Sequence, residues 1–128
     1  MPEPKRVYEI DGARFSNLQE FAAEFTHVLL KDYEWTGNLD AFNDILRGGF
    51  GTPDGGFILK WKNSELSRER LGYAATIAWY EQRPGLVAER ELAKRHTGGT
   101  LFDWLIEIVQ VHCAGGAEQE DGVELFLE

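Results

Sequence analysis

The stretch Glu34–Leu46, EWTGNLDAFNDIL, contains two aspartates four residues apart, Asp40 and Asp44. Asn38 is a favourable N-cap residue, and the apolar residues after it recur at helical spacing, so the stretch predicts a short helix. Side chains four residues apart lie on one face of a helix, where two like charges cost roughly 0.2–0.5 kcal/mol. The helix dipole stabilises Asp40 in the first turn but does not reach Asp44. The second aspartate therefore calls for an explanation.

The other residues of this predicted helix separate into two faces. Leu39, Phe42, Ile45 and Leu46 form the apolar face, and Asp40, Asn43, Asp44 and Arg47 fall on the polar face. Gly48 and Gly49 then stop the helix and open a glycine-rich loop, Gly48–Gly56. Phosphate-binding loops run from a strand into a helix, whereas this loop runs from a helix into a strand. It also lacks GK[ST] and a complete GxGxxG, so no nucleotide site is expected.

Predicted strands and helices alternate on both sides of this stretch. Strands are expected at Arg6–Ile10, Phe57–Trp61 and Val123–Glu128. Helices are expected at 17–31 with Ser16 or Asn17 as cap, at 38–48, at 64–71 with Ser64 as cap, at 74–82, at 86–96 and at 100–112. Strands separated by helices pair in parallel through right-handed crossovers, which predicts an α/β domain with a small sheet. The length of 128 residues fits one domain over 1–128.

The charge of the chain favours a basic partner. The net charge is −9, which is unfavourable for phosphate backbones, so direct binding of nucleic acid is not expected. Residues 103–128 carry seven acids and no Lys or Arg, whereas residues 62–96 carry seven basic and five acidic side chains. A net charge of this sign suits a soluble protein, or one whose partner is basic.

Several classes of protein are not expected. No apolar run approaches the ~20 residues of a membrane span, and the N-terminus has no signal-peptide pattern, so we expect a cytoplasmic protein without membrane contact. Cys113 is the single cysteine and is interpreted as a buried or half-buried thiol. The histidines, His27, His96 and His112, show no metal-ligand spacing, and no metal or cofactor is expected. No serine lies in a G-x-S-x-G motif.

Acids and aromatic residues together favour a protein interface. Asp103 and Glu107 repeat the four-residue acid spacing on the last predicted helix. Two acids on an exposed turn are most often simply solvated, but two helices that tolerate self-repulsion indicate a surface kept for a partner. Trp35 and Phe50 flank the first acid pair, and aromatic residues beside charges are typical of interface anchors. For Trp35, a position in the core is an equally open alternative.

The segment TGNLDAFNDIL resembles the signature of the barstar family, the intracellular protein inhibitors of secreted ribonucleases. A glycine-containing turn precedes Asn-Leu-Asp-Ala, and a second aspartate follows. The resemblance extends over Val7–Leu71 and Leu101–Glu128, and it implies a three-stranded parallel sheet packed with helices. Residues 72–99 have no counterpart in the short members of the family. They are expected to form a helical insertion, either a second contact surface or a lid on one face of the sheet.

The resemblance also implies how a partner is bound. In the family, carboxylates of this helix stand in for the phosphates of RNA in the active-site cleft of a ribonuclease. Asn38, Asp40 and Asp44 match the motif, Gly48 matches the small residue after the helix, and Glu107 matches an acid on the last long helix. The residues expected to bind a partner are Trp35, Asn38, Asp40, Asn43, Asp44, Gly48, Phe50 and Glu107.

The expected function is therefore that of a non-enzymatic inhibitor, a monomer that forms a 1:1 complex with a basic ribonuclease. Asn43 and Arg47 depart from the family pattern, since an aromatic residue often precedes the second aspartate and a positive charge beside the acids disfavours a cationic partner. The alternative is an immunity or regulatory module of the same fold for a different basic protein. A carboxylate enzyme is a third possibility, although the sequence offers no metal or base beside the acids.

Overall fold

The computed structural model describes residues 5–48, 50–53 and 55–128, and Gly49 of the predicted helix stop lies outside these ranges. Its strands are β1 (Val7–Asp11), β2 (Ile58–Lys62) and β3 (Glu124–Leu127). Its helices are α1 (Leu18–Leu29), α2 (Leu39–Arg47), α3 (Ser64–Arg70), α4 (Tyr73–Glu81), α5 (Val87–Lys94) and α6 (Leu101–Val111), with short 3-10 turns at Gly12–Arg14 and Gln119–Asp121. No helix within the described ranges combines the length and the apolar character needed to cross a membrane.

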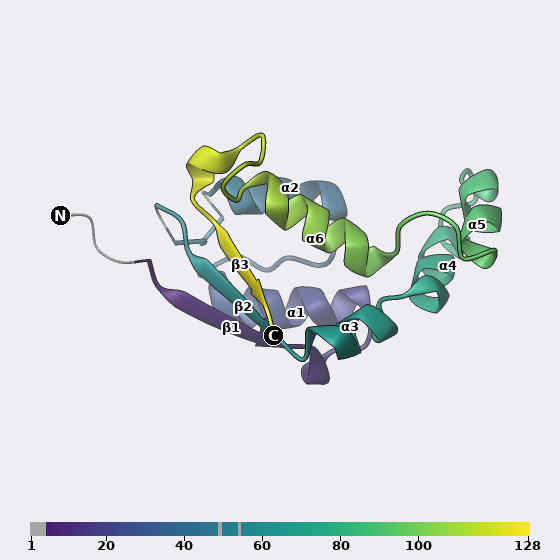
Figure 1. Ribbon diagram of the computed structural model, residues 1–128, viewed down its shortest axis with the longest axis horizontal. Coiled ribbons are helices and arrows are strands. Elements are labelled where there is room, and N and C mark those ends of the chain that lie inside the picture. The colour runs from purple at the N-terminus through teal and green to yellow at the C-terminus, as the bar shows by residue number, and fades with distance from the viewer. Residues whose placement is uncertain (1–4, 49, 54) are drawn as a thin grey trace.

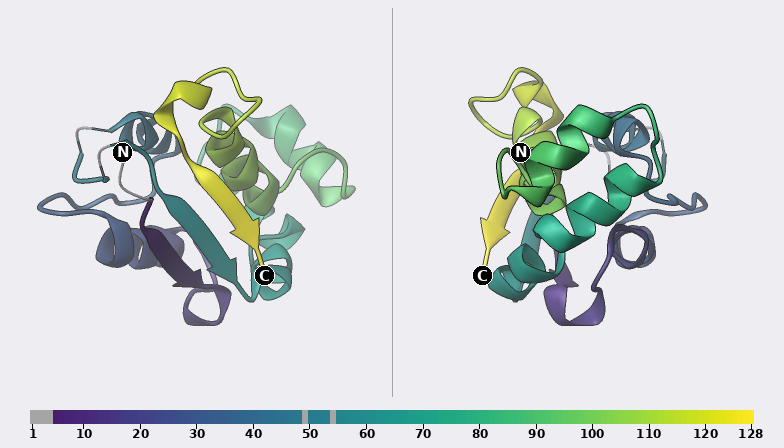
Figure 2. Two further views of the ribbon diagram at one scale, coloured as in Figure 1. Left: turned by 60° about the vertical axis from the view of Figure 1, so that its left-hand side comes forward. Right: turned by 90° about the vertical axis from the view of Figure 1, so that its right-hand side faces the viewer.

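The three strands form one parallel sheet in the order β1-β2-β3 (Figure 1). Helices α1, α2 and α6 lie on one side of this sheet (Figure 2). Accordingly Leu59 and Trp61 of β2 are fully buried, whereas Ile58 and Lys60, which alternate with them, are only half-buried. The prediction of a small three-stranded parallel sheet packed with helices is confirmed.

Aromatic side chains of α1, α2 and β2 form the centre of the core. Phe21 stacks on Trp61 with ring centroids 5.1 Å apart, and Phe25 meets Phe42 edge to face at 5.0 Å. All four rings are fully buried. Because buried aromatic rings contribute most of the apolar area in such a core, they fix α2 against α1 and the sheet.

Two predicted helix caps have different outcomes. Asn17 caps α1, since its side chain accepts a hydrogen bond from the amide of Glu20. The prediction that Ser64 caps α3 is wrong: the N-cap is Asn63, in a left-handed conformation with φ 54°. Ser64 is instead the first helical residue, and its hydroxyl donates to the main-chain oxygen of Glu128 at 3.0 Å.

The segment 72–99 forms α4 and α5, which pack against each other, and α4 also reaches α6. Both helices lie beyond one end of the sheet rather than over it (Figure 1). The alternative of a lid on the sheet is therefore wrong for this segment.

Candidate protein-binding site

The two aspartates of α2 lie on its exposed face. Asn38 starts the helix by accepting a hydrogen bond from the amide of Ala41 at 3.0 Å. Asp40 and Asp44 are exposed, one turn apart, while Phe42 is fully buried between them in sequence. The geometry thus matches the predicted acidic face.

Arg47 holds Asp44 in place. Its Nη1 lies 2.7 Å from Oδ1 of Asp44, and its Nε lies 2.6 Å from Oε1 of Glu118 in the segment after α6. The hydrogen bond to Glu118 is the main reason that the pKa of Arg47 is raised above its ordinary value. The cation that the sequence placed beside the acids therefore forms a bridge between two of them, and it reduces the rotational freedom of Asp44.

A buried histidine, His112, joins α2 to the segment that carries Glu118. His112 is fully buried, with Nδ1 2.6 Å from Oδ2 of Asp121 and Nε2 2.7 Å from Oδ1 of Asn43. A carboxylate only accepts, so Nδ1–H donates to Asp121. Asn43 is consequently tied to the interior and is half-buried. This ties α2 to the segment that carries Glu118.

The same group is the one described cluster with the composition of a metal site. One ligand atom each of His112, Glu118 and Asp121 lies within 4.8 Å of the others. However, Nδ1 of His112 already donates to Asp121, and Glu118 is already bound by Arg47. Hydrogen bonding alone therefore accounts for the arrangement.

The aromatic candidates separate into one support and one exposed contact. Trp35 is only 2% exposed and stacks on Phe42 at 4.5 Å, so its assignment as a direct contact is corrected to a core position. Its Nε1 donates to the main-chain oxygen of Asn38 at 2.9 Å and thereby fixes the start of α2. Phe50 is 37% exposed and packs against the equally exposed Tyr33, with ring centroids 5.1 Å apart.

Two glycines, Gly48 at the end of α2 and Gly51 directly after Phe50, shape the chain in this region. Gly48 ends α2 at φ 109°, a conformation that strains any L side chain, although a Cβ there would meet no other atom. Gly51 is tightly constrained, since a Cβ would lie 2.3 Å from the main-chain oxygen of Lys31. These glycines place the Tyr33–Phe50 pair beside the end of the acidic helix.

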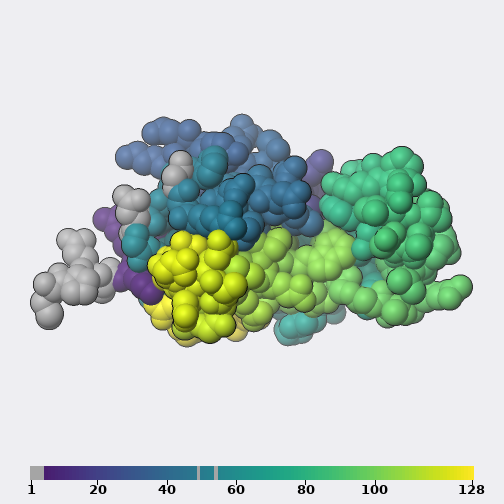
Figure 3. All heavy atoms as spheres, turned by 90° about the horizontal axis from the view of Figure 1, so that it is seen from above, coloured from purple at the N-terminus to yellow at the C-terminus, as the bar shows by residue number. Residues whose placement is uncertain are grey.

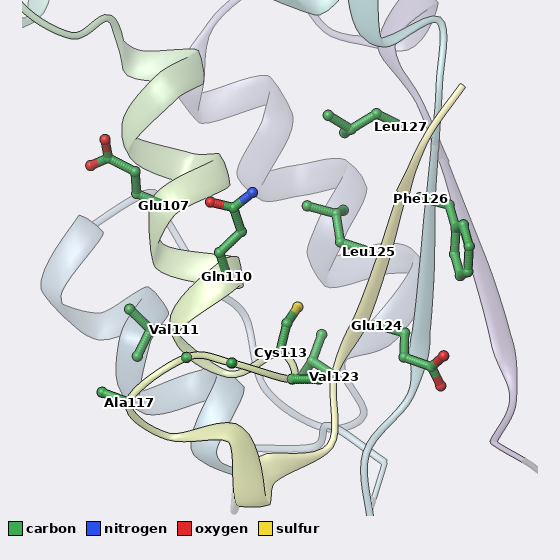
Figure 4. Close-up of a pocket in the computed structure, with 13 residues that line it drawn as sticks. Glu107, Gln110, Val111, Cys113, Ala117, Val123, Glu124, Leu125, Phe126 and Leu127 are labelled. Carbon is green, nitrogen blue, oxygen red and sulfur yellow. The ribbon is translucent and has the colours of Figure 1, made fainter.

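The acids of α6 do not form a second exposed pair. Asp103 completes a capping box: its Oδ2 accepts from the amide of Thr100 at 3.0 Å, and Thr100 Oγ1 accepts from the amide of Asp103. The prediction that Asp103 belongs to a binding surface is therefore corrected. Glu107 is exposed and projects from α6 on the side away from β3, at the rim of the groove between them (Figure 4). Helix α2 packs against α6, the helix that carries Glu107.

Sequence reasoning missed the residues that support the acidic face. His112, Glu118 and Asp121 lie about seventy positions away from α2 in the chain, and no local pattern pairs them with it. The cluster of acids after α6 was the only available signal. Cys113 is half-buried as predicted, and burial raises the pKa of its thiol, so this thiol stays protonated at neutral pH.

A small parallel sheet with helices packed on one face, one of which exposes two acids, places this chain among compact α/β proteins. A family model described as Barstar (barnase inhibitor) matches residues 5–83, more than half of the chain. The chain belongs to the barstar family. The match includes β1, α1, α2, β2, α3 and α4, whereas α5, α6 and β3 lie outside it. A search of curated proteins found no match to this chain.

Proposed function

We propose that this protein inhibits a ribonuclease without catalysing a reaction, by inserting the acidic face of α2 into the substrate cleft of the enzyme. The observation that carries the proposal is Asp44, exposed on α2 and held by the bridge from Arg47 to Glu118. Preorganisation of this kind lowers the entropy cost of binding. The description of the family as barnase inhibitors supports the same class of partner.

We assign the remaining contacts with the enzyme to residues near Asp44 according to how exposed their side chains are. Asp40 and Asp44 would pair with cationic groups of the cleft, while Asn38, Gly48 and the Tyr33–Phe50 pair would border them. Glu107 on the neighbouring helix would reach the edge of the same partner. Asn43 would act indirectly, through His112. We expect a monomer that binds one enzyme in the cytoplasm, and association that slows at high salt because exposed charges are screened.

The first test is a titration of the purified protein into a barnase-type ribonuclease, with RNA cleavage as the readout. Asp44→Ala should weaken inhibition at least thirtyfold, since truncating one partner of a buried charge pair costs about 2–5 kcal/mol. That range rests partly on the barnase–barstar complex itself and is a precedent from this family. Unfolding in urea should change little, because an exposed ion pair contributes about 0–1 kcal/mol.

Glu65→Ala is the matched control. Glu65 forms an i,i+3 pair with Arg68 on α3, at 3.5 Å, as Asp44 does with Arg47 on α2. The substitution therefore removes the same charge from the same kind of pair. It should leave inhibition unchanged. Equal effects of the two substitutions, or unfolding caused by Asp44→Ala, would contradict the assignment of the site.

A second candidate is a barstar-fold immunity or regulatory module for another basic protein. It is favoured by Arg47, which neutralises part of the charge that a ribonuclease cleft would meet. Absence of ribonuclease inhibition by the native protein, together with Asp44-dependent binding of a different basic protein, would support this candidate instead.

A further inference from the structure

We propose that the notch between α1, residues 36–38 and α4 is a second contact surface, which receives an acidic side chain of the partner that binds α2. The notch has a volume of about 420 Å³ and takes lining residues from each of these segments. Figure 3 shows the blue surface that includes α2 and the green α4–α5 segment side by side on one face of the molecule. The identity of the partner rests on the proposed function, but the chemistry of the notch does not.

The polar part of the notch carries several hydrogen-bond donors. Asn17 and Asn38 both line it, and each uses its side-chain oxygen to cap a helix. A backbone amide needs an acceptor, so these caps fix which atom is the oxygen and leave both NH₂ groups as donors. Neither NH₂ group has a partner among the described residues. None of the residues that line the notch in the described chain is an acid.

Arg83 supplies the charge. Its guanidinium lies 3.7 Å from the centroid of the Trp79 ring, and both residues line the notch and are half-buried. Within the described residues the guanidinium makes one hydrogen bond, from Nη1 to the main-chain oxygen of Trp79, at 2.9 Å. Stacking holds the planar group in place and leaves its other donors available. A positive, donor-rich hollow of this kind fits a carboxylate.

The notch is continuous with the acidic face. Asn38 belongs to the notch and also caps α2, two residues before Asp40. A partner seated on α2 would therefore extend over it. Such a partner would present cationic groups to Asp40 and Asp44 and an acid to Arg83. Opposite signs on adjacent patches reject partners that lack the second charge, which makes α4 a determinant of specificity.

The notch can be tested without any enzyme. N-acetyl-aspartate methylamide, titrated into isotope-labelled protein and followed by NMR, should cause saturable shifts of the side-chain amides of Asn17, Asn38 and Gln82. Arg83→Gln should abolish saturation, whereas Asp44→Ala should retain it. Absence of saturable shifts, or saturation by inorganic phosphate but not by the aspartate probe, would overturn the carboxylate site.

The contact with the partner is tested by inhibition of a barnase-type ribonuclease. Arg83→Glu should weaken inhibition about tenfold, the size of a half-exposed charge contact. Because Arg83 also packs on Trp79, Gln82→Glu provides a second variant that adds an acid to the notch without removing that contact. Arg95→Glu, exposed at the end of α5, is the matched control and should have no effect.

The outcomes separate the two proposals. Sensitivity to Arg83→Glu and Gln82→Glu but not to Arg95→Glu supports the second contact. Equal inhibition by all three variants overturns it, while sensitivity to Asp44→Ala still upholds the proposed function. If the native protein inhibits no ribonuclease, the proposed function fails, and the NMR titration alone decides whether the notch binds a carboxylate.

Discussion

Helices α2 and α6 carry acids at the same four-residue spacing, and the structure uses them differently. On α6, Asp103 is bound by the amide of Thr100 and serves the helix itself. On α2, Asp44 faces solvent and is held by Arg47. The spacing of like charges therefore does not define a binding surface. What separates the two helices is whether the carboxylate satisfies the backbone of its own helix.

Among the substitutions considered, the largest expected loss of stability comes from removing His112, which binds Asn43 of α2. His112→Ala removes a fully buried ring and leaves Asp121 and Asn43 without their partner. We expect a loss of about 2–4 kcal/mol in the free energy of unfolding, measured in urea. His27→Ala, the same substitution at an exposed position of α1, should cost less than about 0.5 kcal/mol. Similar losses for both would show that the network contributes nothing.

Removing one acid from each helix sharpens the comparison directly. Asp103→Ala should lower the free energy of unfolding by about 1 kcal/mol, because it breaks a capping box. Inhibition of the ribonuclease should change by less than about twofold, since the carboxylate of Asp103 is bound by the amide of Thr100. Asp44→Ala should show the reverse pattern. A loss of inhibition in Asp103→Ala at full stability would return Asp103 to the binding surface.

Substitution of Arg47 tests two effects separately, the net charge that α2 presents to a partner and the fixed position of the Asp44 side chain. Arg47→Ala should raise the association rate about two- to fivefold, because a rim cation that repels the partner is removed. Dissociation should also be faster, since Asp44 loses the group that holds it. Stopped-flow measurements at several salt concentrations report both rates. A slower association would mean that Arg47 itself attracts the partner.

The smallest expected effect on the free energy of unfolding comes from Asp11, and this effect depends on pH. Hydrogen bonds, chiefly from Asn63 and then from the amide of Ala13, lower the pKa of Asp11 below its ordinary value of 3.8. A lowered pKa stabilises the folded state above the unfolded pKa, and this contribution is lost as the pH falls through the folded pKa. At pH 7 the free energy of unfolding of the native protein should exceed that of Asp11→Asn by less than about 1 kcal/mol. Unfolding in urea at a series of pH values should show this difference vanish below the pKa that Asp11 has in the folded state.

Much of the fold follows from local patterns. The turn residues and the apolar periodicity predicted each strand and helix to within a few residues, because α1, α2 and α6 bury one continuous face. Asn38 was recognisable as a cap from its position alone, whereas the position left Ser16 and Asn17 open for α1, of which Asn17 is the cap. Trp35 could not be placed in this way, since an indole beside a charged helix suits either a core or an interface.

The hydrogen bonds that connect α2 to the segment after α6 could not be predicted from the sequence, for a physical reason. The bonds from His112 to Asn43 and from Arg47 to Glu118 join residues about seventy positions apart. Such bonds form only after α2 and α6 pack together, so they leave no periodic signal in either segment. The two exposed aspartates and Arg47 beside them could be predicted, but the long-range bonds from Arg47 to Glu118 and from Asn43 to His112 could not.

The open edge of the sheet has a consequence for the solubility of the protein. β3 is an edge strand with Phe126 and Leu127 exposed, a surface on which another copy could add a strand. Glutamates stand on both sides of this apolar centre, at 124 and 128. In an antiparallel pair centred on Phe126, Glu124 of one copy would face Glu128 of the other, twice. Like charges directly opposite are destabilising, so this edge strand resists pairing with its own copy.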